Sequence, residues 1–485
     1  MRVYSTIFNV LKELYYMKKT KIVCSIGLHQ TDEEIKQMLK NGMNVARFDL
    51  GSLSYDYCEK MIAKVRDIAS KLGLVCGIMV ENSGPTLRVG TLDNGHITLK
   101  EGSEIEIYNK PRVGTKEGFS ILYSNLLKDV REGTHLLFGD ATAELEVTAK
   151  MTETLICKVV KGGELTNKEI VHIPTIHLSA PYVSQKDRDD IAFAHRLGVD
   201  FLALSFVRSH EDILDITDAL IEEDDEHIQL IAKIENKQSL EDIDAIINLC
   251  DGIMIARGDL GIEVSLERLP GIQKQIVKKA HLANKLAIVS TEMLTSMMVS
   301  IIPTRAEISD IYNAVMDSVD AVCLNKETSL GNHPVESVQM MTNIIEVAEE
   351  ELDYGKILRD MNVTDLQDVT SSIAYSVVDM ANHLNIKGII LATNTGYTAK
   401  KMSMFRPPVP VVATSPDDQT VSSLTLHYGI YPTKTKHFLT TDEIVIGCKK
   451  VITKELSLKE KDLVIITGGF PATAGYTNFM KVEEL

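Results

Sequence analysis

The sequence predicts an α/β protein: a closed (β/α)8 barrel of the TIM type, with an inserted all-β domain and a C-terminal open α/β domain. Eight short, mostly β-branched runs, nearly all followed by helical patterning, predict the barrel, because eight β/α units can close a parallel sheet on itself. Alternating apolar and polar residues between the third and fourth runs predict the inserted domain. A fresh alternation of apolar runs and amphipathic helices after the eighth run predicts the third domain.

The predicted elements follow in chain order. Barrel strands are expected at residues 21–26, 43–49, 75–81, 199–206, 230–235, 252–256, 286–291 and 321–325. Strands of the C-terminal domain are expected at residues 388–392, 410–413 and 462–466. The resulting domains are an N-terminal extension (1–16), a barrel (17–85 and 175–344), an inserted β-domain (86–174) and a C-terminal α/β regulatory domain (345–485). Residues 1–16 are either a short helical extension or an over-long start before Met17.

Composition and charge exclude several classes of protein. The 485 residues carry a formal net charge of −17, which argues against nucleic acid or an anionic membrane as the main partner, since both attract basic surfaces. The seven cysteines are dispersed, without a C-x-x-C pair, so buried reduced thiols in a cytoplasmic protein are expected. Polar residues interrupt the apolar runs near the N-terminus, so neither a signal peptide nor a membrane span is expected.

Charged side chains stand where two neighbouring strands end. Lys233 and Glu235 lie two residues apart in a strand and therefore project to the same face. One strand later, Asp259 follows Gly258, which allows the backbone to turn tightly. Carboxylates without nitrogen or sulfur ligands suit Mg²⁺ or Mn²⁺ rather than zinc. The alternative is a structural ion pair at a sheet edge, since unpaired buried charges are costly.

Further polar side chains are expected at this end of the barrel, where β/α barrels carry their chemistry. They are Arg47, Asp49, Glu81, Ser205, Thr291, Asn325 and Glu327. Arg47 offers a planar fork for phosphate or carboxylate, and Lys233 offers a point charge for a moving phosphoryl group. No His or Cys ends one of these predicted strands, so a nucleophile–His–Asp triad is not expected. The set predicts phosphoryl transfer or metal-assisted enolate chemistry.

Six motifs resemble the signatures of the pyruvate kinase family and occur in that family's order. They lie at residues 20–27, 42–47, 233–236, 256–261, 291–297 and 303–307. The resemblance covers the chain from Met17 onward and implies the glycolytic transfer of a phosphoryl group from phosphoenolpyruvate to ADP, giving ATP and pyruvate through an enolate. The segment from Arg305 to Glu307 resembles the family's subunit interface, which implies a homotetramer. Alternatively, it is an ordinary barrel helix capped by Thr304.

The resemblance also implies a role for each matching residue. Lys233 would neutralise the phosphoryl group in flight, while Glu235 and Asp259 would hold Mg²⁺ (or Mn²⁺). Arg47 would contact phosphate, and Thr291 would lie beside the enolate carbon and help its protonation. The backbone amides that would receive the substrate carboxylate are those of Ala256, Arg257, Gly258 and Asp259.

Departures from the family pattern gather beside these residues. The positions that bind K⁺ in the family correspond here to Asp49, Gly51, Glu81 and Asn82. Thr86 stands where potassium-independent members tend to have Lys. Three interpretations remain open. Asp49, Glu81 and Asn82 hold K⁺ or another monovalent cation, or Lys326 supplies the charge internally, or the chain is a weakened or non-catalytic paralogue that binds phosphoenolpyruvate and acts in regulation. Retention of the catalytic motifs favours an active enzyme with an unusual monovalent-cation response.

The inserted domain is expected to act as a nucleotide lid. Arg88 falls where the family places a nucleotide-phosphate contact near the hinge of this domain. Alternatively, Arg88 is a solvated surface arginine, since arginine is usually exposed. A metal-dependent lyase of the class II aldolase type is a further alternative, against which the inserted domain counts, because a lyase needs no nucleotide lid.

One loop of the C-terminal domain has the pattern of a phosphate cradle. Its residues Thr393, Asn394, Thr395, Gly396, Tyr397 and Thr398 follow an apolar strand and open a helix. The alternative is a strand–helix turn with a hydroxyl cap. The resemblance implies a phosphorylated allosteric effector here, with a second loop at residues 467–470 and 475–477, and a sugar phosphate is our hypothesis for the ligand.

Overall fold

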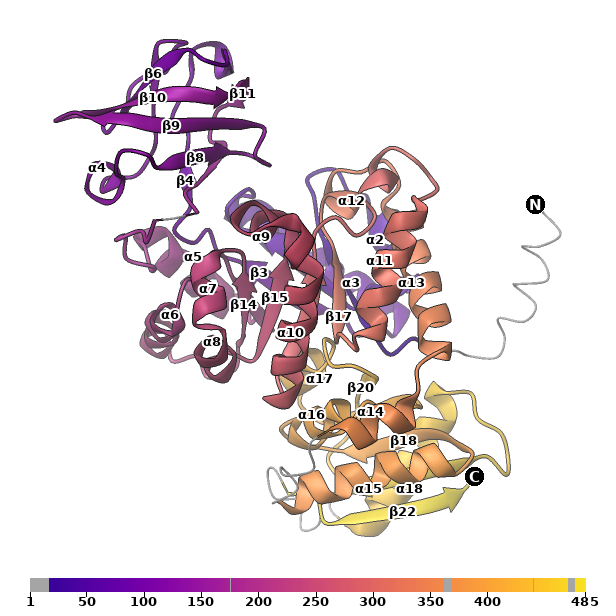
Figure 1. The fold of residues 1–485 in the computed structure, drawn as a ribbon. Helices are drawn as coiled ribbons and strands as arrows, with labels where there is room; N and C mark the ends of the chain where they lie inside the picture. The colour runs from indigo at the N-terminus through magenta and orange to yellow at the C-terminus, as the bar shows by residue number, and fades with distance from the viewer. Residues whose placement is uncertain (1–16, 175, 362–367, 439, 470–475) are drawn as a thin grey trace.

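The computed structural model describes residues 17–174, 176–361, 368–438, 440–469 and 476–485. Figure 1 shows three domains, with a barrel in the centre, a small sheet domain at the upper left and an α/β domain below. The predicted extension at residues 1–16 lies outside the described residues.

The central domain is a closed barrel of eight parallel strands, which confirms the predicted fold class. The strands are β1 (Lys21–Ser25), β2 (Val45–Asp49), β3 (Gly77–Glu81), β13 (Phe201–Leu204), β14 (Gln229–Ile234), β15 (Gly252–Ala256), β16 (Leu286–Ser290) and β17 (Ala321–Leu324). Every strand residue except Asp49 is buried, because helices cover the outside of the barrel while side chains fill its interior. This double burial explains why the strands appear in the sequence as almost continuous apolar runs.

Helices follow each strand and pack their apolar faces on the barrel. They are α2 (Asp32–Lys40), α3 (Tyr55–Leu72), α5 (Gln185–Arg196), α6 (His210–Glu222), α7 (Lys237–Glu241), α8 (Ile243–Leu249), α9 (Arg257–Glu263), α10 (Leu269–Leu282), α11 (Arg305–Met316), α12 (Lys326–Ser329) and α13 (Pro334–Glu350). Helix α3 shows the local reasons: Ser54 caps its first turn, Gly73 ends it at a φ of 68°, and Met61, Ile62 and Val65 line its buried face.

The inserted domain is a small β-structure with its own apolar core. Its main sheet has the order β4 (Leu87–Arg88), β12 (Ile170–His172), β8 (His135–Phe138), β9 (Ala143–Lys150), β10 (Thr154–Lys161), β6 (Glu104–Tyr108) and β7 (Gly118–Ser120). A short helix α4 (Leu126–Asp129) and a second sheet of β11 (Gly163–Thr166) and β5 (His96–Leu99) complete it. Because β4 and β12 pair with each other, the chain enters and leaves this domain through adjacent strands.

The C-terminal domain is a five-stranded sheet with helices on both faces. The sheet order is β20 (Ile430–Lys434), β19 (Val411–Ser415), β18 (Ile386–Ala392), β21 (Leu463–Gly468) and β22 (Phe479–Glu484). Its helices are α14 (Tyr354–Asp360), α15 (Val369–His383), α16 (Tyr397–Met404), α17 (Asp418–Ser423) and α18 (Thr441–Glu455). The three central strands match the sequence prediction, whereas the edge strands β20 and β22 were not predicted. The predicted boundary at residue 345 falls inside α13, whose Ile345 and Ala348 pack in the barrel core.

Leu426 of the C-terminal domain closes one end of the barrel. It is completely buried among Val23, Phe201 and Ile231 of the barrel interior. All seven cysteines are buried and none forms a disulfide, as their dispersed positions in apolar runs predicted. Among the described residues, no helix has the length and apolar character needed to cross a membrane.

Candidate functional site

The C-terminal ends of β2, β3 and β14 bring three charged side chains into one buried cluster. Glu81 lies between two cations, accepting a hydrogen bond from Arg47 Nε at 2.7 Å and one from Lys233 Nζ at 2.8 Å. Ser205 Oγ donates to the same carboxylate at 3.1 Å. Asn325 Oδ1 accepts from Arg47 Nη1 at 3.0 Å. These bonds fix both cations in the mouth of the barrel.

The opposite charges in this cluster stabilise one another's ionised forms. Burial by itself raises the pKa of Glu81, but the positive charges of Arg47 and Lys233 outweigh it and lower this pKa to about 2. Burial likewise lowers the pKa of Lys233, but the carboxylates of Glu235 and Glu81 raise it by more, so it lies above its ordinary value. All three side chains are therefore ionised at neutral pH.

Glu235 and Asp259 are two neighbouring carboxylates beside Lys233. Glu235 Oε2 accepts a hydrogen bond from the Phe206 amide at 2.6 Å. Its Oε1 lies 2.7 Å from Lys233 Nζ, yet this buried oxygen has no hydrogen bond of acceptable geometry among the described residues. Burial raises the pKa of Glu235 to about 7, with the neighbouring Asp259 charge adding to the effect, and burial raises the pKa of Asp259 too.

This pair fits a divalent cation. Two adjacent carboxylates that burial makes reluctant to ionise are stabilised together when a cation sits against both. The two side chains offer only oxygen atoms as metal ligands, which suits Mg²⁺ or Mn²⁺. Glu235 and Asp259 are therefore the residues that could hold the metal.

The turn after β15 sets the position of Thr291. A Cβ atom on Gly258 would lie 2.8 Å from Thr291 Cγ2, so only glycine allows this close approach. Thr291 has a φ of 76°, which is an outlier for a β-branched residue and indicates local backbone strain. Arg257 holds the turn with its side chain, which pairs with Asp310 at 2.6 Å and donates to the Thr291 carbonyl at 2.8 Å. Its guanidinium therefore supports the turn, whereas the amides of the first turn of α9, which begins after Ala256, need partners from outside the helix.

His172 was missed by the sequence reasoning, which considered only the ends of barrel strands. It ends β12, the last strand of the inserted domain, and is only 5% exposed. Its Nε2 lies 3.7 Å from Asp259 Oδ1 and its Nδ1 lies 3.9 Å from Glu263 Oε1. Burial lowers the pKa of His172 and raises that of Glu263 to about 7. The inserted domain thus places a neutral imidazole against a carboxylate that could hold the metal.

The three residues predicted for a monovalent cation do not converge on one open site. The Asp49 carboxylate is bound by its own loop. It accepts hydrogen bonds from the Gly51 amide at 2.9 Å and from Ser52 Oγ at 2.6 Å. Asn82 donates to Asp187 at 2.9 Å and accepts from the Ser205 amide at 2.8 Å. The carboxylate of Glu81 is taken up by the two cations described above.

Two further predicted positions lie outside the cluster. Lys326 is exposed at the start of α12. Arg88 lies on β4 at the hinge of the inserted domain, where its guanidinium donates to the Lys168 carbonyl at 3.0 Å and to Thr86 Oγ1 at 3.3 Å. Arg88 is half-buried, and its position at the hinge leaves both the nucleotide contact and the surface role open.

Residues 393–396 join β18 to α16, and Tyr397 and Thr398 are the first two residues of that helix. Thr393 Oγ1 accepts a hydrogen bond from the Gly396 amide at 3.0 Å, which is the hydroxyl-capped turn of the simpler interpretation. Asn394 lies in the same turn, and its carbonyl accepts from Thr420 Oγ1 at 3.1 Å. The same loop also lines a pocket that includes Lys436. In the second predicted loop, residues 470 and 475 lie outside the described residues.

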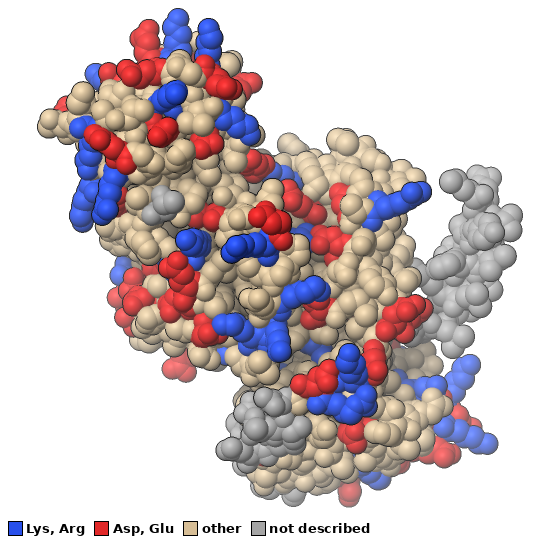
Figure 2. Space-filling view, viewed as in Figure 1, with Lys and Arg blue, Asp and Glu red and all other residues tan. Residues whose placement is uncertain are grey.

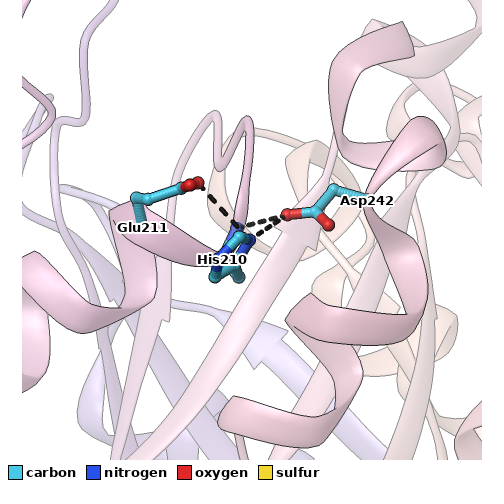
Figure 3. A group of neighbouring side chains, drawn as sticks. All are labelled: His210, Glu211 and Asp242. Atoms are coloured by element: carbon cyan, nitrogen blue, oxygen red, sulfur yellow. Dashed lines mark hydrogen bonds and ion pairs between the residues drawn. The ribbon is translucent and has the colours of Figure 1, made fainter.

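A separate group of His210, Glu211 and Asp242 lies at the start of α6 (Figure 3). Asp242 Oδ2 accepts hydrogen bonds from the His210 backbone amide at 2.7 Å and from its ring Nδ1 at 2.6 Å. A metal ion on His210 Nδ1 would have to displace the hydrogen bond of the ring. We therefore interpret the group as a helix cap.

The fold, together with the charged cluster at the C-terminal ends of the barrel strands, defines a class of protein. Fixed cations beside a pair of carboxylates stabilise negative charge as it develops on oxygen, so this is the architecture of a β/α-barrel enzyme.

Comparisons with known proteins identify the family. The model of the pyruvate kinase barrel domain matches residues 17–338, and that of the pyruvate kinase alpha/beta domain matches residues 371–483. Similar relatives are the pyruvate kinases of Bacillus licheniformis, 39% identical, and Geobacillus stearothermophilus, 38% identical, each over 472 residues. The alignments cover 96% of this chain and 80% of each relative. The chain belongs to the pyruvate kinase family, as its motifs predicted.

Proposed function

We propose that this chain transfers the phosphoryl group of phosphoenolpyruvate to ADP, producing ATP and pyruvate in glycolysis. The observation that carries the proposal is the arrangement of Arg47 and Lys233 around Glu81, next to the carboxylates of Glu235 and Asp259. Fixed cations beside a metal-binding pair are the elements that phosphoryl transfer requires, because little covalent chemistry is left for the protein to perform.

Each residue has a distinct part in this reaction. Arg47 contacts the substrate phosphate, and Lys233 neutralises the phosphoryl group as it leaves the enol oxygen for a β-phosphate oxygen of ADP. Glu235 and Asp259 would hold Mg²⁺ or Mn²⁺, which would supply positive charge to stabilise negative charge on the substrate oxygens. Thr291 lies beside the enolate carbon and helps its protonation, which gives pyruvate. The amides of residues 256–259 receive the substrate carboxylate, and Arg88 contacts the nucleotide when the inserted domain closes.

A coupled assay tests this function. Pyruvate formation from phosphoenolpyruvate is measured with and without ADP, in the presence of Mg²⁺. Turnover that depends on ADP supports the proposal. Binding of phosphoenolpyruvate without turnover identifies a non-catalytic regulatory paralogue, and pyruvate formation without ADP identifies a different reaction of the same barrel.

The monovalent-cation response of the enzyme should be unusual. Glu81 is already paired with Arg47 and Lys233, and the polar groups of Asp49 and Asn82 are engaged within the protein. We therefore expect weak activation by K⁺. Initial rates measured against K⁺ in Na⁺-free buffer test this, and strong ordinary activation by K⁺ contradicts it.

We also infer a phosphorylated effector at the loop from Thr393 to Thr398. Support comes from the pocket that this loop shares with Lys436, a cation able to receive phosphate. Isothermal titration with common sugar phosphates tests the idea. Absence of heat, or binding that survives Thr393→Ala combined with Thr398→Ala, contradicts it.

Assembly as a cytoplasmic homotetramer is a further part of the proposal. Its support is a group of exposed apolar side chains beside and on α11, namely Val299, Ile301, Ile302 and Ile308. Light scattering on the purified chain tests the oligomeric state, and a monomer at micromolar concentration contradicts the assembly.

A further inference from the structure

A pocket lies between the barrel and the C-terminal domain, at the opposite end of the barrel from the charged cluster. Its barrel wall includes Gln229 at the start of β14 and Lys285 immediately before β16. Its other wall includes Lys400 and Lys401 of α16 and Arg406. The space between the atoms is about 670 Å³, part of which is open to solvent. We call this space the interdomain pocket.

The interdomain pocket is rich in positive charge. Four cations line it, Lys285, Lys400, Lys401 and Arg406, against two carboxylates, Asp251 and Asp320. Asp320 is already paired with Arg406 at 2.5 Å. Figure 2 shows Lys and Arg side chains gathered on the lower part of the barrel, just above the C-terminal domain. A local excess of cations is notable in a chain whose net charge is −17.

The lysines of α16 lack strong partners. Among the described residues, neither Lys400 nor Lys401 lies within 4 Å of a carboxylate oxygen. Lys400 Nζ donates only a long hydrogen bond, of 3.4 Å, to Gln229 Oε1. Burial removes water from the ammonium group of Lys400 and thereby lowers its pKa. A bound anion would stabilise this charge.

Two buried nitrogen atoms of the pocket lining have no hydrogen-bond partner within the described part of the chain. They are Arg406 Nε and His427 Nδ1, on side chains that are 2% and 5% exposed. A buried polar group left without a partner costs about 1–3 kcal/mol, so such groups indicate a bound water, ion or ligand. The His427 nitrogen is a second observation, independent of the four cations, among which Arg406 is already counted.

We propose that the interdomain pocket binds a small phosphate-bearing anion, held by Lys400 and Lys401 and completing the hydrogen bonds of Arg406 and His427 directly or through ordered water. Lysine suits this role because its ammonium group acts as a point charge for phosphate. The site is distinct from the pocket lined by Thr393, Asn394 and Thr398, although Tyr397 of the same loop lines the interdomain pocket. Because its walls belong to two domains, the anion stabilises their contact.

Thermal unfolding and isothermal titration of the full chain test the proposal. Inorganic phosphate, a hexose phosphate and a nucleoside monophosphate are titrated separately at constant ionic strength. The test variant is Lys400→Gln combined with Lys401→Gln, and the matched control is Lys387→Gln, an exposed lysine on β18. Thr393→Ala combined with Thr398→Ala removes hydroxyls of the effector loop and separates the two sites.

The expected result is binding of at least one of the three anions, with a rise in unfolding temperature. Both effects should persist in the Lys387→Gln and Thr393→Ala/Thr398→Ala variants, and the affinity should fall at least tenfold in the Lys400→Gln/Lys401→Gln variant. An unchanged circular dichroism spectrum shows that this variant remains folded. The proposal is overturned if none of the three anions binds, or if the Lys400→Gln/Lys401→Gln variant binds them as tightly as the natural chain.

Discussion

Replacement of Glu81 by glutamine gives a quantitative test of the charged cluster. The carboxylate lies between Arg47 and Lys233 and is 6% exposed, so its ionised form is stabilised by the folded protein. Its pKa of about 2, against an ordinary value of 4.5, corresponds to about 3 kcal/mol of stability at neutral pH. Breaking a buried pair by removing one partner costs a similar amount, about 3–5 kcal/mol.

The sign of the pH dependence follows from the lowered pKa of Glu81. A carboxylate whose pKa is lower in the folded protein binds fewer protons there than in the unfolded chain. Its contribution is therefore present above pH 4.5 and is lost as the pH falls toward about 2. In Glu81→Gln this part of the acid-induced loss of stability should disappear.

Urea unfolding of the full chain at neutral pH, followed by circular dichroism, measures the effect. Glu81→Gln is expected to lower the free energy of unfolding by about 3 kcal/mol. The control Glu226→Gln, which alters an exposed carboxylate, should change it by less than about 0.5 kcal/mol. Equal unfolding curves for Glu81→Gln and the natural chain would refute the proposed balance of charges.

Three further predictions concern the mouth of the barrel. Gly258→Ala should lower kcat while the protein stays folded, because the new methyl group displaces Thr291; an unchanged kcat argues against the role of Thr291. Asp259→Asn should weaken Mn²⁺ binding, measured by electron paramagnetic resonance, at least tenfold, and retention of full affinity removes Asp259 from the metal site. His172→Phe should weaken Mn²⁺ binding, because it removes the ring nitrogen that lies 3.7 Å from Asp259 Oδ1, whereas His172→Gln should recover part of it. Equal affinities in both His172 variants would mean that the residue only packs at the hinge.

The barrel strands could be predicted because their pattern is local. Strands buried on both faces appear as apolar runs, and eight such runs with helices between them leave few alternatives to a closed barrel. Strands β20 and β22 could not be recognised in the same way. Pro432 interrupts β20, and β22 carries Lys481, Glu483 and Glu484. Both strands lie at sheet edges, where pairing with the neighbouring strand decides the structure.

The sequence could predict those residues of the candidate site that lie at the ends of barrel strands. The spacing of Lys233 and Glu235, and the glycine before Asp259, place these side chains at the same end of the barrel. His172 could not be found by that reasoning, because it comes from the inserted domain and its approach to Asp259 depends on how that domain sits over the barrel.

The sequence by itself determined the fold class, the order of the domains and the family of this protein, since these depend on local patterns and motif order. Only the tertiary structure decided how the charges are paired. Glu81 lies between Arg47 and Lys233 while Asp49 turns back on its own loop, although the two acidic residues are direct neighbours in the sheet register. The interdomain pocket likewise exists only in the folded chain. The physical reason is that such contacts join residues far apart in sequence, and strand register and side-chain reach select among them.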